Sequence, residues 1–180
     1  MKYEATIGLE THIMQKTGTK MFCACKYEYG AEPNSHVCPV CLGYPGALPV
    51  MNEKAIELCC KAGLLLGCSI NPYSKFDRKN YFYPDMAKNY QITQADQPLC
   101  LGGQLVVEVD GESKTIRIER IHQEENAAKN THVAGGSLVD YNRAGTALME
   151  IVSEPCMHSA AEAIAYMTAL KQIMQYGGIS

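Results

Sequence analysis

Two close pairs of cysteines, set in a stretch dense in glycine and proline, constrain this chain more than any other feature of its sequence. Cys23 and Cys25 form one pair, and Cys38 and Cys41 form the other after twelve intervening residues. Zinc prefers four ligands in a tetrahedron, and each short-spaced pair can supply two of them. The spacing predicts a small irregular knob at about residues 18–50 that holds structural Zn²⁺ through these four thiolates. A knob of buried free thiols without metal is the alternative.

The other cysteines and the first residues bear on the cellular compartment. The chain has nine cysteines, an odd number. Residues 1–14 alternate polar and apolar side chains, unlike a secretory leader. No stretch of about 18 apolar residues occurs that could cross a membrane. We therefore expect a cytoplasmic protein with no membrane contact, whose cysteines are thiols or metal ligands rather than disulfides.

Composition limits the chain to a folded domain without a strong bulk charge. Its 180 residues are 47% apolar and 19% charged, which is enough to bury a core and argues against disorder. The formal net charge of −3 is too balanced to indicate nucleic-acid binding by overall electrostatics. Any contact with RNA would have to come from local basic clusters.

Alternating side chains predict most of the strands. An Asp-Gly pair at 110–111 between two such segments is a hairpin signal. By contrast, residues 71–98 are polar and tyrosine-rich with little periodicity, so we expect them to be irregular. The predicted strands are residues 3–14, 105–109, 115–122, 137–142 and 147–153.

Two helices are indicated by capping residues and apolar spacing. Asn52 can cap a helix that ends at Gly67, and Ser159 can cap one that ends at Gly177. Strands flanked by helices predict an α+β fold, with a mostly antiparallel β-sheet and the cysteine-rich knob as an appendage.

Carboxylates occur on or beside several of the predicted strands. Glu10 and His12 are two residues apart and therefore share one face of their strand. Glu124 and Glu125 follow another strand, and Glu150 lies in an apolar run where an unpaired carboxylate would be costly. If these groups converge they could hold Mg²⁺, which takes oxygen ligands and usually keeps waters and substrate phosphates. A solvated strand face is the alternative for Glu10 and His12.

Basic and aromatic side chains alternate in residues 75–85, KFDRKNYFYPD. Cations can bind phosphate and rings can stack on a base, although rings packed on the sheet with charges in water would give the same pattern. Arg143, in a predicted turn, is a further candidate for a phosphate contact or an ordinary surface arginine. No G-x-x-x-x-G-K-[ST] motif occurs, so a P-loop nucleotide site is excluded.

Several segments together resemble the B subunit of the glutamyl/aspartyl-tRNA amidotransferases, and the resemblance spans essentially the whole chain. They are IGLETH at 7–12, AEPN at 31–34, CPVCLG at 38–43, KFDRKNYFYPD at 75–85, SLVDYNR at 137–143 and EIVSEP at 150–155. The resemblance implies that residues 1–180 are the N-terminal part of the family's catalytic "cradle" domain. The helical and tail domains of the family would be absent, and such a fragment is expected to be inactive alone.

The resemblance also implies an activity. In this family ATP phosphorylates the side-chain carboxylate of Glu or Asp misattached to tRNA-Gln or tRNA-Asn. Ammonia, released from glutamine in the partner A subunit, then displaces the phosphate, and a small third partner, the C subunit, wraps the pair. By the same match, Mg²⁺ is assigned to Glu10, His12, Glu125 and Glu150, with Glu124 as the alternative to Glu125.

Lys79 and Arg143 are assigned to phosphate or substrate by the same resemblance. One departure from the family pattern concerns residues 121–129, IHQEENAAK, where Asn126 replaces an acid and Ala128 a glycine. A metal site that used that acid would be weakened.

The competing interpretations are a zinc-knob scaffold that binds RNA or protein without catalysis, and a metal-dependent hydrolase. A scaffold would have no use for converging carboxylates, and a hydrolase would need a base that the sequence does not identify.

Overall fold

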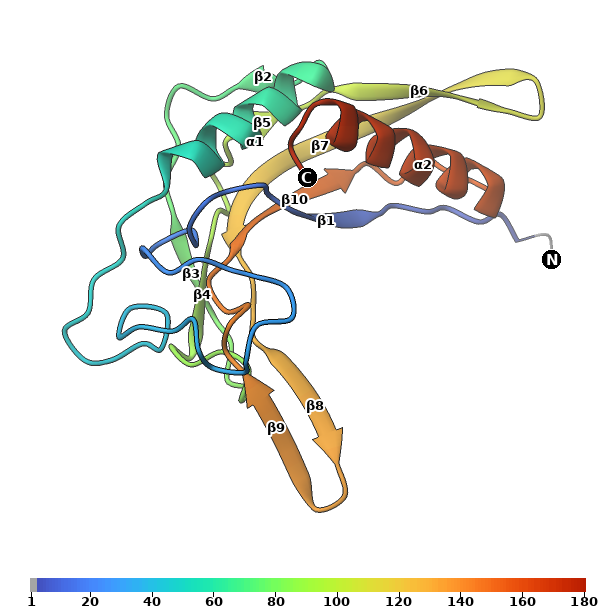
Figure 1. Cartoon of the computed structure of the whole chain (residues 1–180). Helices are drawn as coiled ribbons and strands as arrows, with labels where there is room; N and C mark the ends of the chain where they lie inside the picture. Colours follow the sequence, from blue (N-terminus) through green and yellow to red (C-terminus); the bar gives the residue numbers. More distant parts are fainter. Residues whose placement is uncertain (1–2) are drawn as a thin grey trace.

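The computed structural model describes residues 3–180 and confirms the predicted α+β class. One antiparallel sheet forms the centre of the molecule (Figure 1), with strand order β1–β10–β7–β5–β2 and with β6 paired to the first half of β7. Its strands are β1 (Glu10–Met14), β2 (Ser69–Ile70), β5 (Cys100–Leu101), β6 (Gln104–Val109), β7 (Glu112–Glu125) and β10 (Ala147–Ser153).

Two hairpin-like sheets lie outside this central sheet. They pair β3 (Asp77–Asn80) with β4 (Tyr90–Thr93), and β8 (Lys129–Val133) with β9 (Gly136–Asp140). The β8–β9 hairpin projects away from the rest of the molecule (Figure 1). The expectation that residues 71–98 are irregular is therefore wrong for β3 and β4, and β8 was not predicted.

The first strand is shorter than predicted. Only Glu10–Met14 pairs with β10, and before it Ile7 makes a single bridge with Met157. Between this bridge and β1, the backbone amide of Leu9 donates to the side-chain hydroxyl of Ser153 at 2.9 Å. Pro155 has no amide hydrogen, so it cannot extend the strand pairing. The predicted hairpin is confirmed: Asp110 and Gly111 both have positive φ, as a tight type I′ turn requires.

The two helices have the predicted caps. The side chain of Asn52 accepts backbone amides at the start of α1 (Glu53–Leu65), and the hydroxyl of Ser159 accepts the amide of Glu162 in α2 (Ala160–Tyr176). Both helices lie on one face of the sheet (Figure 1) and bury their apolar sides there. The core joins α1 and α2 to β7 and β10 through Leu58, Cys59, Tyr166, Leu170, Ile116, Ile121 and Met149.

A register shift in β7 decides which residues face the core. Val152 of β10 pairs with Arg120, but the next residue, Ser153, pairs with Ile118. One extra residue of β7 is accommodated there, as in a β-bulge. Beyond the shift Ile121 and Gln123 are fully buried on the core side. The alternate residues of β7 therefore point to the face away from the helices.

The cysteine-rich knob is irregular, as predicted. No helix or strand occurs within residues 18–50, all of which the structure describes. Across the described part of the chain, residues 3–180, no helix has the length and apolar character needed to cross a membrane.

Candidate functional site

Three neighbouring strands carry a row of ionisable side chains on the face of the sheet away from the helices. His12 of β1 is the cross-strand partner of Glu150 in β10, and Glu150 is the partner of His122 in β7. Cross-strand partners have Cβ atoms about 5 Å apart. Glu10 and Glu124 lie two residues from His12 and His122, so the two-residue period of a strand puts them on the same face.

Three of these side chains come together closely enough to bind one cation. Nε2 of His12 is 3.2 Å from Oε2 of Glu150 and 3.5 Å from Oε2 of Glu124. One ligand atom from each of the three residues lies within 4.8 Å of the others. Mg²⁺ binds oxygen at about 2.1 Å in an octahedron, so adjacent ligands are about 3 Å apart. Two carboxylates and an imidazole at these separations fit Mg²⁺ or Mn²⁺.

Hydrogen bonds from two neighbouring side chains fix the carboxylate of Glu124. Oε1 of Glu124 accepts a hydrogen bond from the hydroxyl of Thr93 at 3.0 Å, and its Oε2 accepts one from the side-chain amide of Gln91 at 3.1 Å. Glu124 and Glu150 are both buried, whereas the side chain of His12 is 51% exposed. The cluster therefore has a rigid buried side and one side open to a ligand.

His122 is the buried member of the row. Nε2 of His122 is 3.1 Å from Oε1 of Glu124 and 3.5 Å from Oε2 of Glu150. Burial alone would lower the pKa of this imidazole, but the hydrogen bonds and charges of the two glutamates outweigh it and raise the pKa to about 9. The same hydrogen bond from His122 lowers the pKa of Glu150. The positive charge that His122 carries at neutral pH therefore offsets part of the negative charge of Glu124 and Glu150.

Although His12 lines a separate cavity beside α2, the two glutamates of the cluster and His122 line a cavity of about 380 Å³. The edge formed by β3 and β4 closes one side of it and adds positive charge to the acidic wall. Such a mixture suits a cation together with an anionic ligand. The lining residues are Glu10, Asp77, Arg78, Lys79, Thr93, Gln94, Ala95, Arg120, His122, Glu124 and Glu150.

Glu125 is not brought to this cluster. It follows Glu124 on β7 and therefore points to the opposite face. There its carboxylate forms an ion pair with the ammonium of Lys88 and accepts the amide of Ile92 at 2.9 Å. Burial raises the pKa of Glu125, although Lys88 opposes the shift. Of the two alternatives from the sequence, Glu124 is the one that lies beside His12 and Glu150.

Among the other candidates, Glu10 and Lys79 line the cavity but Arg143 does not. The guanidinium of Arg143 donates to the carbonyl oxygens of Ala127 and Ala128 at 3.0 and 2.8 Å. These bonds fix the backbone of the segment in which Ala128 replaces the glycine of the family pattern, and Ala128 is buried. In this structure Arg143 therefore holds backbone carbonyls in place. It lines a separate cavity, together with Tyr27 and Lys129.

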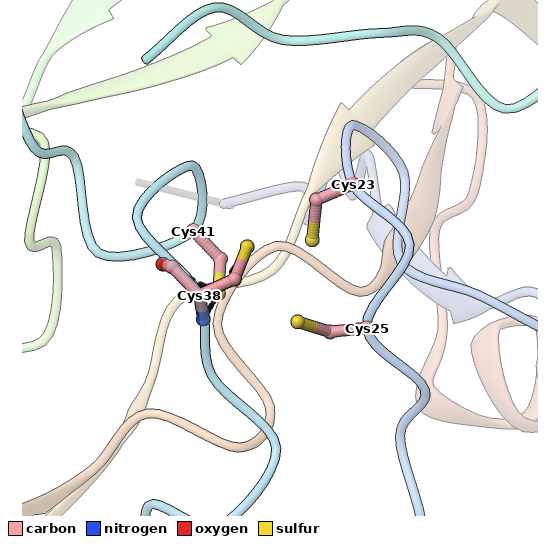
Figure 2. Close-up of side chains that lie close together, drawn as sticks. All are labelled: Cys23, Cys25, Cys38 and Cys41. Atoms are coloured by element: carbon pink, nitrogen blue, oxygen red, sulfur yellow. Dashed lines mark hydrogen bonds between the residues drawn. The ribbon is translucent and has the colours of Figure 1, made fainter. Parts of the chain in front are cut away.

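The four cysteines of the knob gather as predicted. Figure 2 shows the sulfur atoms of Cys23 and Cys25 pointing from one loop toward those of Cys38 and Cys41 on the other. All four Sγ atoms lie within 4.8 Å of one another, and those of Cys38 and Cys41 are 3.8 Å apart. A Zn–S bond of about 2.3 Å in a tetrahedron requires sulfurs about 3.8 Å apart. The donor set therefore fits zinc.

A buried lysine accompanies the cysteine cluster. Lys20 is only 1% exposed, and its ammonium lies 3.5 Å from Sγ of Cys41 and donates to the carbonyl of His36 at 2.9 Å. The hydrogen bond from Cys23 lowers the pKa of the Cys41 thiol to about 4, and the charge of Lys20 acts in the same direction. Cys41 is thereby stabilised as thiolate, the form that binds metal, while the same hydrogen bond raises the pKa of the Cys23 thiol.

Sequence reasoning missed several residues of this region. His122, Arg78 and Arg120 line the acidic cavity without having been proposed for it. A signal for His122 was available, because it is two residues before Glu124 and shares its face. Nothing in the sequence indicated Lys20 or Lys88, whose roles depend on loops that meet only in the folded chain.

Comparisons with known proteins show which family the chain resembles. The family described as the GatB/GatE catalytic domain matches residues 5–180. The chain is 58% identical over 181 residues to the B subunit of the Aspartyl/glutamyl-tRNA(Asn/Gln) amidotransferase of Thermoanaerobacter pseudethanolicus. It is 55% identical over 184 residues to the protein of the same name from Moorella thermoacetica. Both alignments include all of this chain but only 38% and 39% of the relatives, so the chain spans well under half of their length.

Proposed function

The chain belongs to the GatB/GatE catalytic-domain family, and from this we propose that it is the N-terminal part of the cradle domain in the B subunit of a tRNA-dependent amidotransferase. Its substrate would be Glu or Asp misattached to tRNA-Gln or tRNA-Asn, and its partners would be the A and C subunits of the same enzyme. The observation that carries the proposal is the convergence of His12, Glu124 and Glu150, of which the two glutamates line a cavity together with Lys79.

The chemistry requires a better leaving group than a carboxylate can offer. An oxygen of the substrate carboxylate attacks the γ-phosphorus of ATP, and ADP leaves. Ammonia from glutamine hydrolysis in the A subunit then attacks the carbonyl carbon of the acyl phosphate, phosphate leaves, and the nitrogen loses a proton. The products are an amide, ADP and phosphate.

The residues of this chain have separate parts in that reaction. Glu124, Glu150 and His12, with Glu10 beside them, would hold Mg²⁺, which supplies charge neutralisation to the transferring phosphoryl group. Lys79 and Arg78 lie on the β3 side of the cavity and can bind phosphate oxygens. Zn²⁺ held by Cys23, Cys25, Cys38 and Cys41 would be structural, because four protein ligands leave no open position.

The test places substitutions in a full-length B subunit that contains this segment, assembled with the A and C subunits. Glu124→Gln and Glu150→Gln should each lower tRNA amidation by about 100-fold or more, because they remove a ligand of the cation. Glutamine hydrolysis in the A subunit should be retained. Glu108→Gln, at an exposed position of β6, serves as the control.

Amidation that survives in both glutamate variants would refute the proposal. It would instead favour a scaffold role, in which the knob binds RNA or a partner protein and the acids have no chemical task.

A further inference from the structure

His122 differs from the other ionisable residues of the cavity in being almost completely enclosed. Its side chain is 6% exposed, whereas the side chain of His12 in the same cross-strand row is 51% exposed. The two imidazoles thus flank the carboxylates of Glu124 and Glu150 from opposite sides, one buried and one open. Burying an imidazole is costly, so the polar contacts that His122 does make indicate its role.

All hydrogen bonding by His122 is directed at the two carboxylates. Its Nε2 lies 3.1 Å from Oε1 of Glu124 and 3.5 Å from Oε2 of Glu150. Its Nδ1 is buried and has no partner among residues 3–180. An ionised carboxylate can only accept, so Nε2 must be the donor.

Because Nε2 of His122 bonds to only one oxygen of Glu124, the two carboxylate oxygens have different partners. Oε1 receives His122 and the hydroxyl of Thr93, while Oε2 accepts the side-chain amide of Gln91 at 3.1 Å and faces His12 at 3.5 Å. The carboxylate is therefore prevented from rotating, and Oε2 remains directed toward the open side of the cluster. Hydrogen bonds of this kind to a ligand carboxylate preserve its orientation for a metal.

We propose that His122 is a positioning residue that orients Glu124 and Glu150 for a divalent cation without coordinating the cation itself. This rests on the proposed function, because it assumes that His12, Glu124 and Glu150 form the cation site. Loss of such a supporting hydrogen bond usually weakens metal affinity by about 10- to 100-fold.

The experiment measures Mn²⁺ binding to this 180-residue chain by electron paramagnetic resonance. His122→Leu should weaken binding by about 10-fold or more. His122→Gln should stay within about threefold of the unsubstituted chain, because its amide nitrogen can donate from nearly the position of Nε2. His132→Gln, on the exposed β8–β9 hairpin, is the matched control and should bind normally.

A second readout separates positioning from coordination. Coupling of bound Mn²⁺ to an imidazole nitrogen should disappear in His12→Gln and persist in His122→Gln. Melting temperatures establish that each variant is folded. If His122→Leu does not fold, the affinity of His122→Gln relative to His132→Gln decides the question.

Three results would overturn the role of His122. They are normal Mn²⁺ affinity in folded His122→Leu, a loss of about 10-fold or more in folded His122→Gln, or loss of the nitrogen coupling in His122→Gln. Failure of the proposed function looks different. In that case either the unsubstituted chain does not bind Mn²⁺, or its Mn²⁺ binding is unchanged in Glu124→Gln. The role of His122 would then be refuted together with the cation site.

Discussion

Lys88 and Glu125 form a buried ion pair on the face of β7 opposite the acidic cavity. Their side chains are 9% and 3% exposed, and the ammonium also lies 5.1 Å from the ring centre of Tyr90. Removing one member of a buried pair leaves a charge without compensation, which costs more than the intact pair contributes. The pair therefore bears on stability, while its neighbour Glu124 is one of the proposed cation ligands.

Glu125→Gln should lower the free energy of unfolding by about 3 kcal/mol, because Lys88 loses its counter-charge. Chemical denaturation measures this value, and Glu125→Gln combined with Lys88→Met should recover part of the loss. Mn²⁺ binding should be unchanged in the folded single variant. If Mn²⁺ binding is lost while the fold persists, Glu125 is a ligand and our assignment to Glu124 is wrong.

At the level of single residues the sequence predicted most of the side chains that converge, with one exception. His12, Glu10 and Glu150 were proposed and lie at or beside the acidic cluster. Glu125 was assigned to the cluster with Glu124 as the alternative, but the two-residue period of a strand favours Glu124, which shares a face with His122. What the sequence could not contain is the register that aligns β1, β10 and β7, since it depends on pairing between distant segments.

Among the elements, the loop that follows Cys41 connects the knob to the ion pair. Gly43 has φ of +70°, and a Cβ added there would come within 2.9 Å of Cα of Lys88. The knob backbone therefore approaches the Lys88 segment more closely than any side chain would allow. In this way the cysteine knob packs against the residue that pairs with Glu125.

Gly43→Ala should destabilise the chain more than Gly46→Ala. Both glycines have positive φ, so both substitutions strain the backbone by about 1–2 kcal/mol, but an added Cβ at Gly46 meets nothing within 4 Å. Thermal unfolding of the two variants separates strain from the clash with Lys88. Equal melting temperatures would contradict the close packing described here.

Elements with strong local signals were predicted, and those formed by distant contacts were not. Both helices, the β6–β7 hairpin and β10 have caps, a tight turn or apolar runs that act within a few residues. The β3 segment DRKN is polar and mostly exposed, with no alternating pattern. It is a strand because it pairs with β4, and β4 is bonded to the end of β7 through Thr93 and Glu124.

For the whole molecule, the knob and the acidic cavity meet near the end of β7 from opposite sides. The cysteine cluster lies near Glu125, since an added Cβ at Gly145 would be 3.6 Å from Cβ of Cys41 and 3.7 Å from Oε2 of Glu125. Glu124, the preceding residue of β7, faces the cavity. A metal in the knob would therefore stabilise the part of the fold that presents the acids.

The purified chain should contain about one equivalent of zinc, and Cys25→Ser should remove it and lower the melting temperature. Elemental analysis and thermal unfolding measure the two effects. Cys60→Ser is the control, because Cys60 is also half-buried but lies on α1 outside the cysteine cluster. An unsubstituted chain without zinc, or equal zinc in both variants, would contradict the assignment.

The most direct test of the central claim is anomalous diffraction from crystals of this chain soaked with Mn²⁺. We expect a manganese peak within bonding distance of Nε2 of His12 and of the carboxylates of Glu124 and Glu150, with Glu125 still paired to Lys88. A peak bonded to Glu125, or no peak in the cavity at saturating Mn²⁺, would contradict the account.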